Sequence, residues 1–393
     1  METLGEFLPV THWEANDLER LRTGVIGVRG IGGRHVQDLA DSDLADLVGI
    51  ADLDQDLAAK LGESHGVKVW SDYRDMVEKE NLDAVVIATP HHLHAPMGQY
   101  CLEAGLHTFV EKPIANSISE ADKMIAAASA RNLVLAVGHN YRTFPGNRAM
   151  KKLIEEGALG EIYRVLWMWL EARPEGYYDR DIWRCTYEHA GGGVLMNQTS
   201  HDLDLLCWMM GDPVEVSAMV SSWGHKAEIE DTAIANIRFA SGAHCNVQLS
   251  ICDRRLNYRQ ISGDLGTLVY QDEKNANSHI PDEFRIGRYE TPMRSYINGE
   301  EGGVSRQPGI TWEDVHIEDG GETLLNSFLR AAATGGEPIT DGITARRTLE
   351  LINAILYSGI RKEVVELPLD RNNYDALLEE LKQGHVGPFR QPR

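Results

Sequence analysis

The sequence predicts an α/β fold in two parts: an N-terminal parallel sheet, then an α/β domain with a large, mainly antiparallel open sheet. Short apolar runs alternate with helical patterns over residues 23–143, which is typical of parallel strands buried on both faces. A glycine-rich turn follows the first run, and an acidic residue follows the second. From about residue 163 the expected strands are longer, and the later ones have no helices between them. The first part is therefore predicted to be a Rossmann dinucleotide-binding domain.

The chain has 393 residues, enough for two domains with large cores. Its 60 acidic and 38 basic residues give a formal net charge of −22. This charge argues against nucleic acid or an anionic membrane as a partner, because either would need a basic surface. The five cysteines form no CxxC or Cys/His ligand spacing, so neither a disulfide framework nor a structural zinc is expected.

The N-terminal stretch carries acids where a signal peptide needs basic residues, and no segment reaches transmembrane length. We therefore expect a cytoplasmic protein. The expected organisation is an extension at 1–22, the Rossmann domain at 23–143, a substrate-binding and oligomerisation domain at 144–370, and a tail at 371–393.

The second domain is expected to combine long strands with two later helices. The strands are predicted at 162–170, 214–220, 232–239, 243–251 and 260–270, and the helices at 322–334 and 344–361.

The glycine-rich turn joins the first strand to a helical pattern. Gly27 and Gly30 permit a tight turn, and the helix that begins near Ile31 points its N-terminus at the pyrophosphate of a dinucleotide. Asp52 follows the second strand, where it can accept hydrogen bonds from ribose hydroxyls and repel a 2′-phosphate. The pattern predicts NAD rather than NADP. Arg29 stands where the middle glycine of the fingerprint is usual, so its side chain must either point away or meet the pyrophosphate.

Polar residues follow the next three strands, at the edge of a parallel sheet where ligands bind. The candidate cofactor contacts are Thr89, Pro90, His94, Glu111, Lys112 and Asn140. His94 could instead cap the helix expected at 95–104. Pro113 could follow a cis peptide bond, which would be a structural reason for the motif that contains this proline. No acidic or cysteine partner clusters with His91, His92 and His94, so no metal site is predicted.

The segment 191–204 begins with three glycines, which suggest a flexible entry, and continues with polar and apolar residues at helical spacing. Asn197, His201 and Asp204 stand at i, i+4 and i+7, so they share one face of a helix near its start. A histidine beside an asparagine at such a helix start is typical of residues at the edge of a catalytic site. The structural alternative is a core helix with a hydrogen-bonded histidine. Asp204 is expected to brace this helix or a neighbouring loop.

Three motifs together resemble the glucose–fructose oxidoreductase/inositol dehydrogenase/rhizopine-catabolism (Gfo/Idh/MocA) family. They are TPHHLH at 89–94, EKP at 111–113 and the segment 191–204, and the resemblance runs from about residue 23 to 368. It implies a Rossmann domain followed by an α/β domain whose sheet usually forms an oligomer interface, here of a homodimer or homotetramer. It also implies NAD or NADP as cofactor and a sugar or cyclitol bound between the domains.

By position, Lys112 and His201 match the family's active-site lysine and histidine. Asn197 stands where many dehydrogenase members carry an aspartate, which argues against an inositol dehydrogenase. Histidine titrates near neutral pH, so His201 suits the base that removes a hydroxyl proton. Lys112 would stabilise the developing alkoxide, and Asn197 would orient the histidine or bind a substrate hydroxyl. Further candidate substrate contacts are Arg142, Arg173, Tyr178, Trp183 and Arg184.

We therefore predict an NAD-dependent oxidoreductase that acts on a secondary alcohol of a carbohydrate, cyclitol or glycoside. One alternative is a glycoside hydrolase or lyase that oxidises a sugar carbon transiently, eliminates the aglycone and returns the hydride from tightly bound NAD. Another is a non-catalytic regulator that binds NAD and a sugar, although both Lys112 and His201 are retained.

Overall fold

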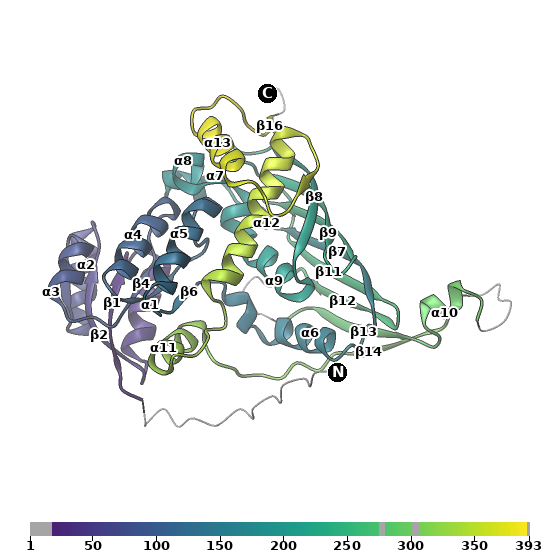
Figure 1. Ribbon diagram of the computed structural model, residues 1–393, viewed down its shortest axis with the longest axis horizontal. Helices are drawn as coiled ribbons and strands as arrows, with labels where there is room; N and C mark the ends of the chain where they lie inside the picture. Colours follow the sequence, from purple (N-terminus) through teal and green to yellow (C-terminus); the bar gives the residue numbers. More distant parts are fainter. Residues whose placement is uncertain (1–17, 275–279, 301–306, 391–393) are drawn as a thin grey trace.

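The computed structural model describes residues 18–274, 280–300 and 307–390. Two sheets organise this part of the chain, with helices between and around them (Figure 1). The predicted α/β class, a parallel sheet followed by a mainly antiparallel one, is confirmed. The expected extension at 1–22 and tail at 371–393 lie partly outside the described residues. Within the described ranges, no helix combines the length and apolar character needed to span a bilayer.

The first sheet contains six parallel strands in the order β3-β2-β1-β4-β5-β6. The strands are β1 (Leu21–Ile26), β2 (Ala45–Ala51), β3 (Lys68–Trp70), β4 (Ala84–Ile87), β5 (His107–Val110) and β6 (Leu135–Val137). The helices are α1 (Ile31–Ala40), α2 (Gln55–His65), α3 (Tyr73–Lys79), α4 (His91–Glu103) and α5 (Ile118–Ser129). The strand order reverses between β1 and β4, and open α/β sheets bind ligands at the carboxyl ends of the strands at such a point.

Local sequence signals set several helix ends. Asp54 caps α2 by accepting a backbone hydrogen bond, and the helix ends at Gly66, which has a φ of 68°. Ser117 begins α5 with a capping box. The helix expected from residue 95 instead begins at His91, directly after the strand-end loop.

The second sheet has ten strands in the order β14-β13-β12-β11-β7-β10-β9-β8-β15, and β16 pairs with β8. They are β7 (Ile162–Leu170), β8 (Pro213–Ser222), β9 (Thr232–Phe239), β10 (His244–Ser250), β11 (Leu256–Gly263), β12 (Gly266–Asp272), β13 (Glu283–Tyr289), β14 (Ile310–Asp314), β15 (Val365–Glu366) and β16 (Phe389–Arg390). The helices of this half are α6 (Pro145–Glu155), α7 (Glu175–Asp179), α8 (Tyr187–Ala190), α9 (Ser200–Met210), α10 (Met293–Ile297), α11 (Leu324–Thr334), α12 (Gly342–Arg361) and α13 (Arg371–Lys382).

One predicted strand was wrong. The segment 260–270 is the hairpin of β11 and β12, and the chain reverses between Gly263 and Gly266. Ile261 and Leu268 lie on opposite sides of this turn, yet both are buried in the same core. Apolar residues on both sides of the turn therefore resembled one continuous strand.

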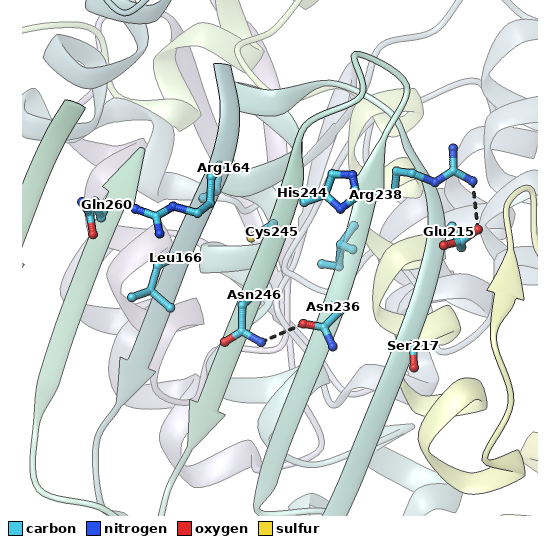
Figure 2. Close-up of a pocket in the computed structure, with 12 residues that line it drawn as sticks. Arg164, Leu166, Glu215, Ser217, Asn236, Arg238, His244, Cys245, Asn246 and Gln260 are labelled. Carbon is cyan, nitrogen blue, oxygen red and sulfur yellow. Dashed lines mark hydrogen bonds and ion pairs between the residues drawn. The ribbon is translucent and has the colours of Figure 1, made fainter. Parts of the chain in front are cut away.

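Helices α9 and α12 cover one face of the second sheet, and Figure 1 shows both between the two sheets. Trp167 and Trp169 are buried on this side. The opposite face carries polar side chains around a shallow hollow of about 410 Å³ (Figure 2). There Asn246 donates a hydrogen bond to Asn236 at 2.9 Å.

Helix α11 packs against the first sheet, although the sequence assigned it to the second domain. Phe328 and Leu329 join the core that contains Val25 and Phe109. The first domain is thus completed by a helix from the far end of the chain.

The two domains meet at a buried ion pair. Arg142, in the short helix η2 (Asn140–Thr143), donates from Nε and Nη2 to Asp204 on α9 at 2.7 and 2.6 Å. Thr348 on α12 donates to the same carboxylate at 3.0 Å. Asp204 therefore has the bracing role expected of it. Arg142, expected at the substrate, instead has its guanidinium committed to this junction.

Candidate active site

A cavity of about 1000 Å³ lies at the carboxyl ends of the first sheet's strands, where the second domain meets them. Most of the predicted site residues line it. They are Gly27, Arg29, Gly30, Ile31, Asp52, Thr89, Pro90, His94, Glu111, Lys112, Asn140, Trp183, Arg184, Asn197 and His201.

The glycine turn provides the surface for a dinucleotide. Gly27 has a φ of 83°, and a Cβ there would lie 2.7 Å from Ala88 O, so this position requires glycine. Gly30 precedes α1, and the first residue of that helix, Ile31, lines the cavity. The N-terminus of α1 therefore fits an anionic pyrophosphate. Arg29 is exposed at the cavity edge, so the missing middle glycine does not obstruct the turn.

Asp52 is held in place by two backbone groups. Its Oδ2 accepts a hydrogen bond from Val28 N at 2.7 Å, and its Oδ1 accepts one from Asp54 N at 2.8 Å. The carboxylate is thereby fixed between the glycine turn and the end of β2. A carboxylate in this place fits the ribose hydroxyls of NAD and repels the 2′-phosphate of NADP.

Lys112 connects the two domains across the cavity. Its Nζ donates a hydrogen bond to Asn197 O at 2.7 Å. Burial lowers the pKa of Lys112 to about 8, with the carboxylate of Glu111 opposing this shift and the charge of Arg184 adding to it. Glu111 is itself paired, because its Oε1 lies 2.8 Å from His35 Nε2. Within the part of the chain that the structure describes, the Lys112 ammonium therefore forms no ion pair with a carboxylate, and it faces the cavity.

His94 connects two loops of the site. Its Nδ1 lies 2.7 Å from Pro113 O, and its Nε2 lies 2.8 Å from Thr89 O. The peptide bond between Lys112 and Pro113 is cis, as the sequence suggested. Because backbone carbonyls engage both ring nitrogens, His94 positions these loops rather than offering a nitrogen to the cofactor.

Asn197 and His201 do not lie on one continuous helix, and this prediction was wrong. Asn197 is in the π-helical turn η4 (Val194–Gln198), and His201 is in the first turn of α9. The hydrogen bond from Thr199 N to Val194 O, at 2.9 Å, closes the wide turn before α9 begins.

The π turn is held by the buried Glu230, which sequence reasoning missed. Its carboxylate accepts hydrogen bonds from Gly193 N at 2.7 Å, Leu195 N at 3.2 Å and Tyr187 Oη at 3.1 Å. A Cβ on Gly193 would lie 1.9 Å from Glu230 O. This glycine therefore serves close backbone contact rather than the flexible entry that was expected.

His201 has a neutral ring at neutral pH. Burial, together with the charges of Lys112 and His139, lowers the pKa of His201 well below its ordinary value. The ring stacks on Tyr141, with centroids 4.5 Å apart and an interplanar angle of 17°. A neutral imidazole at the cavity can accept a proton from a hydroxyl group.

Residues of the second domain give the cavity an aromatic wall, where the sequence predicted the substrate. The Arg184 guanidinium lies 4.6 Å from the Trp183 ring centroid and 5.0 Å from that of Tyr177. Arg184 also pairs with Asp181. The Asn197 side-chain amide donates to Tyr177 Oη at 3.4 Å. This wall combines apolar rings with hydrogen-bonding groups, as sugar binding requires.

The structure does not bring three predicted substrate residues to this wall. Tyr178 is 2% exposed and packs edge-on against His225. Tyr177 lines the cavity in its place. Arg173 is paired with Glu171. Arg142 is committed to the domain junction.

His91 is a further cavity residue, and sequence reasoning considered it only as a metal ligand. Its Nδ1 donates to Ala190 O at 2.9 Å, and its ring lies 4.7 Å from that of Trp183. Burial lowers the pKa of His91 well below its ordinary value. The neutral ring therefore retains Nε2 as an acceptor. Its place in the strand-end segment 89–94 was the available signal.

The sequence and fold have close counterparts. Residues 21–139 match the oxidoreductase family with an NAD-binding Rossmann fold, and residues 147–269 match the GFO/IDH/MocA C-terminal domain. A myo-inositol 2-dehydrogenase of Thermotoga maritima is 30% identical over 362 residues, which cover 88% of this chain and 98% of that protein. A levoglucosan dehydrogenase of Pseudarthrobacter phenanthrenivorans is 27% identical over 352 residues, covering 81% and 89%.

The structure of the WlbA dehydrogenase from Bordetella pertussis, in complex with NADH and UDP-GlcNAcA, resembles this one with a TM-score of 0.76. The identity is 27%, and the match covers 90% of this chain and 100% of that one. Fold, cavity and relatives together define an NAD-dependent oxidoreductase. The chain belongs to the Gfo/Idh/MocA family, as its motifs predicted.

Arg29→Ala should weaken NAD binding about threefold to tenfold, because a cation beside the N-terminus of α1 adds to the attraction of the pyrophosphate. Titration calorimetry at low and high salt measures this. Arg34→Ala is the matched control, since its side chain on the same helix is 73% exposed and pairs with Asp38. Unchanged affinity in Arg29→Ala would mean that the guanidinium points away from the pyrophosphate.

Proposed function

We propose that this protein oxidises a secondary alcohol of a carbohydrate or cyclitol, with NAD as the hydride acceptor. The observation that carries the proposal is the convergence of Lys112 and His201, from different domains, on the cavity that contains the glycine turn and Asp52. The names of the inositol and levoglucosan dehydrogenases support the substrate class.

The residues divide the reaction between them. His201 accepts the hydroxyl proton, because its ring is neutral at neutral pH. The ammonium of Lys112 donates a hydrogen bond to the same oxygen and stabilises the negative charge that develops there. Asn197 orients a neighbouring hydroxyl through its amide, which Tyr177 holds. Bound NAD supplies the nicotinamide that takes the hydride.

The aromatic wall selects the ring of the substrate. Trp183 and Tyr177 offer apolar faces to the C–H groups of a sugar or cyclitol, and Arg184 between them donates hydrogen bonds to its hydroxyls. The relatives named above are dehydrogenases, which favours net oxidation over transient oxidation within a hydrolase.

A panel of sugars, cyclitols and chromogenic glycosides with added NAD tests the proposal. We expect sustained growth of the reduced-nicotinamide absorbance with at least one alcohol. In His201→Ala, kcat should fall about 10²- to 10⁴-fold while NAD still binds, because the proton acceptor is lost and the glycine turn is untouched. His385→Ala, at an exposed histidine after α13, is the control. Aglycone release without lasting NADH would establish the hydrolase instead.

The pH profile should report Lys112. This lysine is charged below its pKa of about 8 and neutral above it, so kcat/KM for oxidation should fall above pH 8 as the cation beside the alkoxide is lost. Lys112→Arg keeps its charge throughout this range, so the fall should disappear, although the absolute rate will be lower. If kcat/KM of Lys112→Arg fell at the same pH, the fall would have to be assigned to another group.

We also propose that the chain forms a homodimer or homotetramer through the open face of the second sheet. Met219 and Ile234 pair across β8 and β9 on this face and are 77% and 44% exposed. Ile234→Asp should shift the sedimenting species toward monomer, whereas Ile343→Asp, at a 63% exposed position of α12, should not. A monomeric wild type, or an unchanged mass in Ile234→Asp, would contradict this assembly.

A further inference from the structure

Three side chains with different donor atoms converge at strand ends of the second sheet, outside the NAD cavity. His225 lies in the loop after β8, Asp231 immediately precedes β9, and Cys252 follows β10. His225 Nδ1 lies 3.2 Å from Asp231 Oδ2 and 3.7 Å from Cys252 Sγ. The three donor atoms all lie within 4.8 Å of one another. His225 and Asp231 are buried, and Cys252 is half-buried.

Two of these separations match the edges of a tetrahedral metal site. Zinc binds sulfur at about 2.3 Å and nitrogen or oxygen at about 2.0–2.1 Å, so the tetrahedron has an N–O edge of about 3.3 Å and an N–S edge of about 3.6 Å. The observed N–O and N–S distances of 3.2 and 3.7 Å match both edges. The carboxylate oxygen and the sulfur lie within 4.8 Å of each other, close enough to share one ion.

The surroundings of His225 fix which nitrogen faces the cluster. Its Nε2 lies 2.8 Å from Arg173 O, and a carbonyl oxygen can only accept, so Nε2 carries the proton. Nδ1 then faces Asp231 Oδ2, and a proton or a metal ion must lie between these two atoms. A backbone carbonyl on the remote nitrogen is also the usual orienting contact of a metal-bound histidine.

The carboxylate is equally well oriented. Asp231 accepts backbone hydrogen bonds from Trp223 N at 2.8 Å, Gly224 N at 2.7 Å and His225 N at 3.1 Å. These N–H groups hold the carboxylate against the imidazole. Such contacts around a ligating carboxylate stabilise a bound ion.

We propose that His225, Asp231 and Cys252 bind one zinc ion. A thiolate, an imidazole and a carboxylate form a donor set that suits zinc and not the hard ions magnesium or calcium. Water at the half-buried side of Cys252 completes the fourth position. Through Arg173 O, the ion braces the chain segment that leads to Tyr177 on the substrate wall. The site is independent of the proposed oxidation.

Metal binding to the full-length protein after chelator treatment tests the proposal, with Zn²⁺ or Co²⁺ as the only addition. We expect one equivalent per chain, and the cobalt form should show a sulfur-to-cobalt charge-transfer band. Cys252→Ser and Asp231→Asn should bind zinc at least about tenfold more weakly, and Cys252→Ser should lose the band. Cys185→Ser is the matched control, because Cys185 is also half-buried but its Sγ contacts Tyr178 O.

A second measurement needs no variant. Zinc should slow the alkylation of Cys252 in the wild type and leave that of Cys185 unchanged, as peptide mass spectrometry would show. Absence of a one-equivalent site would mean that a proton holds the cluster together, and the proposal would fail. Equal zinc binding by Cys252→Ser would place the ion elsewhere, for example at the cavity histidines, and would also overturn it.

Discussion

The active site depends on how the start of α9 is held between two buried ion pairs. Asp204 pairs with Arg142 of the first domain, and Asp202 pairs with Arg259 of the second sheet at 2.9 Å. His201 stands beside Asp202 in the same helical turn and faces the cavity. Removing one partner of a buried pair typically costs about 3–5 kcal/mol, because the other charge remains desolvated. The two pairs thus set where His201 stands relative to Lys112.

Burial that anchors the helix also sets the charges that the chemistry needs. Desolvation disfavours the charged forms of both Lys112 and His201. The Glu111 carboxylate partly offsets the shift at Lys112, whereas the charge of Lys112 adds to the shift at His201, whose ordinary pKa is already much lower. At neutral pH the lysine stays charged and the histidine is neutral. One cavity therefore contains a charged hydrogen-bond donor and a neutral proton acceptor, which oxidation of an alcohol requires.

The sequence predicted those site residues whose positions follow from the local order of strands and turns. Gly27 and Asp52 are marked by their positions at strand ends, and those positions follow from hydrophobic periodicity. Arg142 has the same local pattern whether its guanidinium meets a substrate or a carboxylate, and its partner Asp204 is distant along the chain. The π turn likewise depends on Glu230, which reaches it from the start of another strand.

Strands of the second sheet help to position the aromatic wall. The segment before α7 is bonded to the chain around β10, through Glu171 N to Ser250 O at 2.9 Å and Arg173 N to Ile251 O at 3.0 Å. The glycine turn and Asp52, which form the proposed NAD surface, lie by contrast on the first sheet. Changes at the ends of the second sheet can therefore reshape the wall around Tyr177 without altering the nucleotide surface.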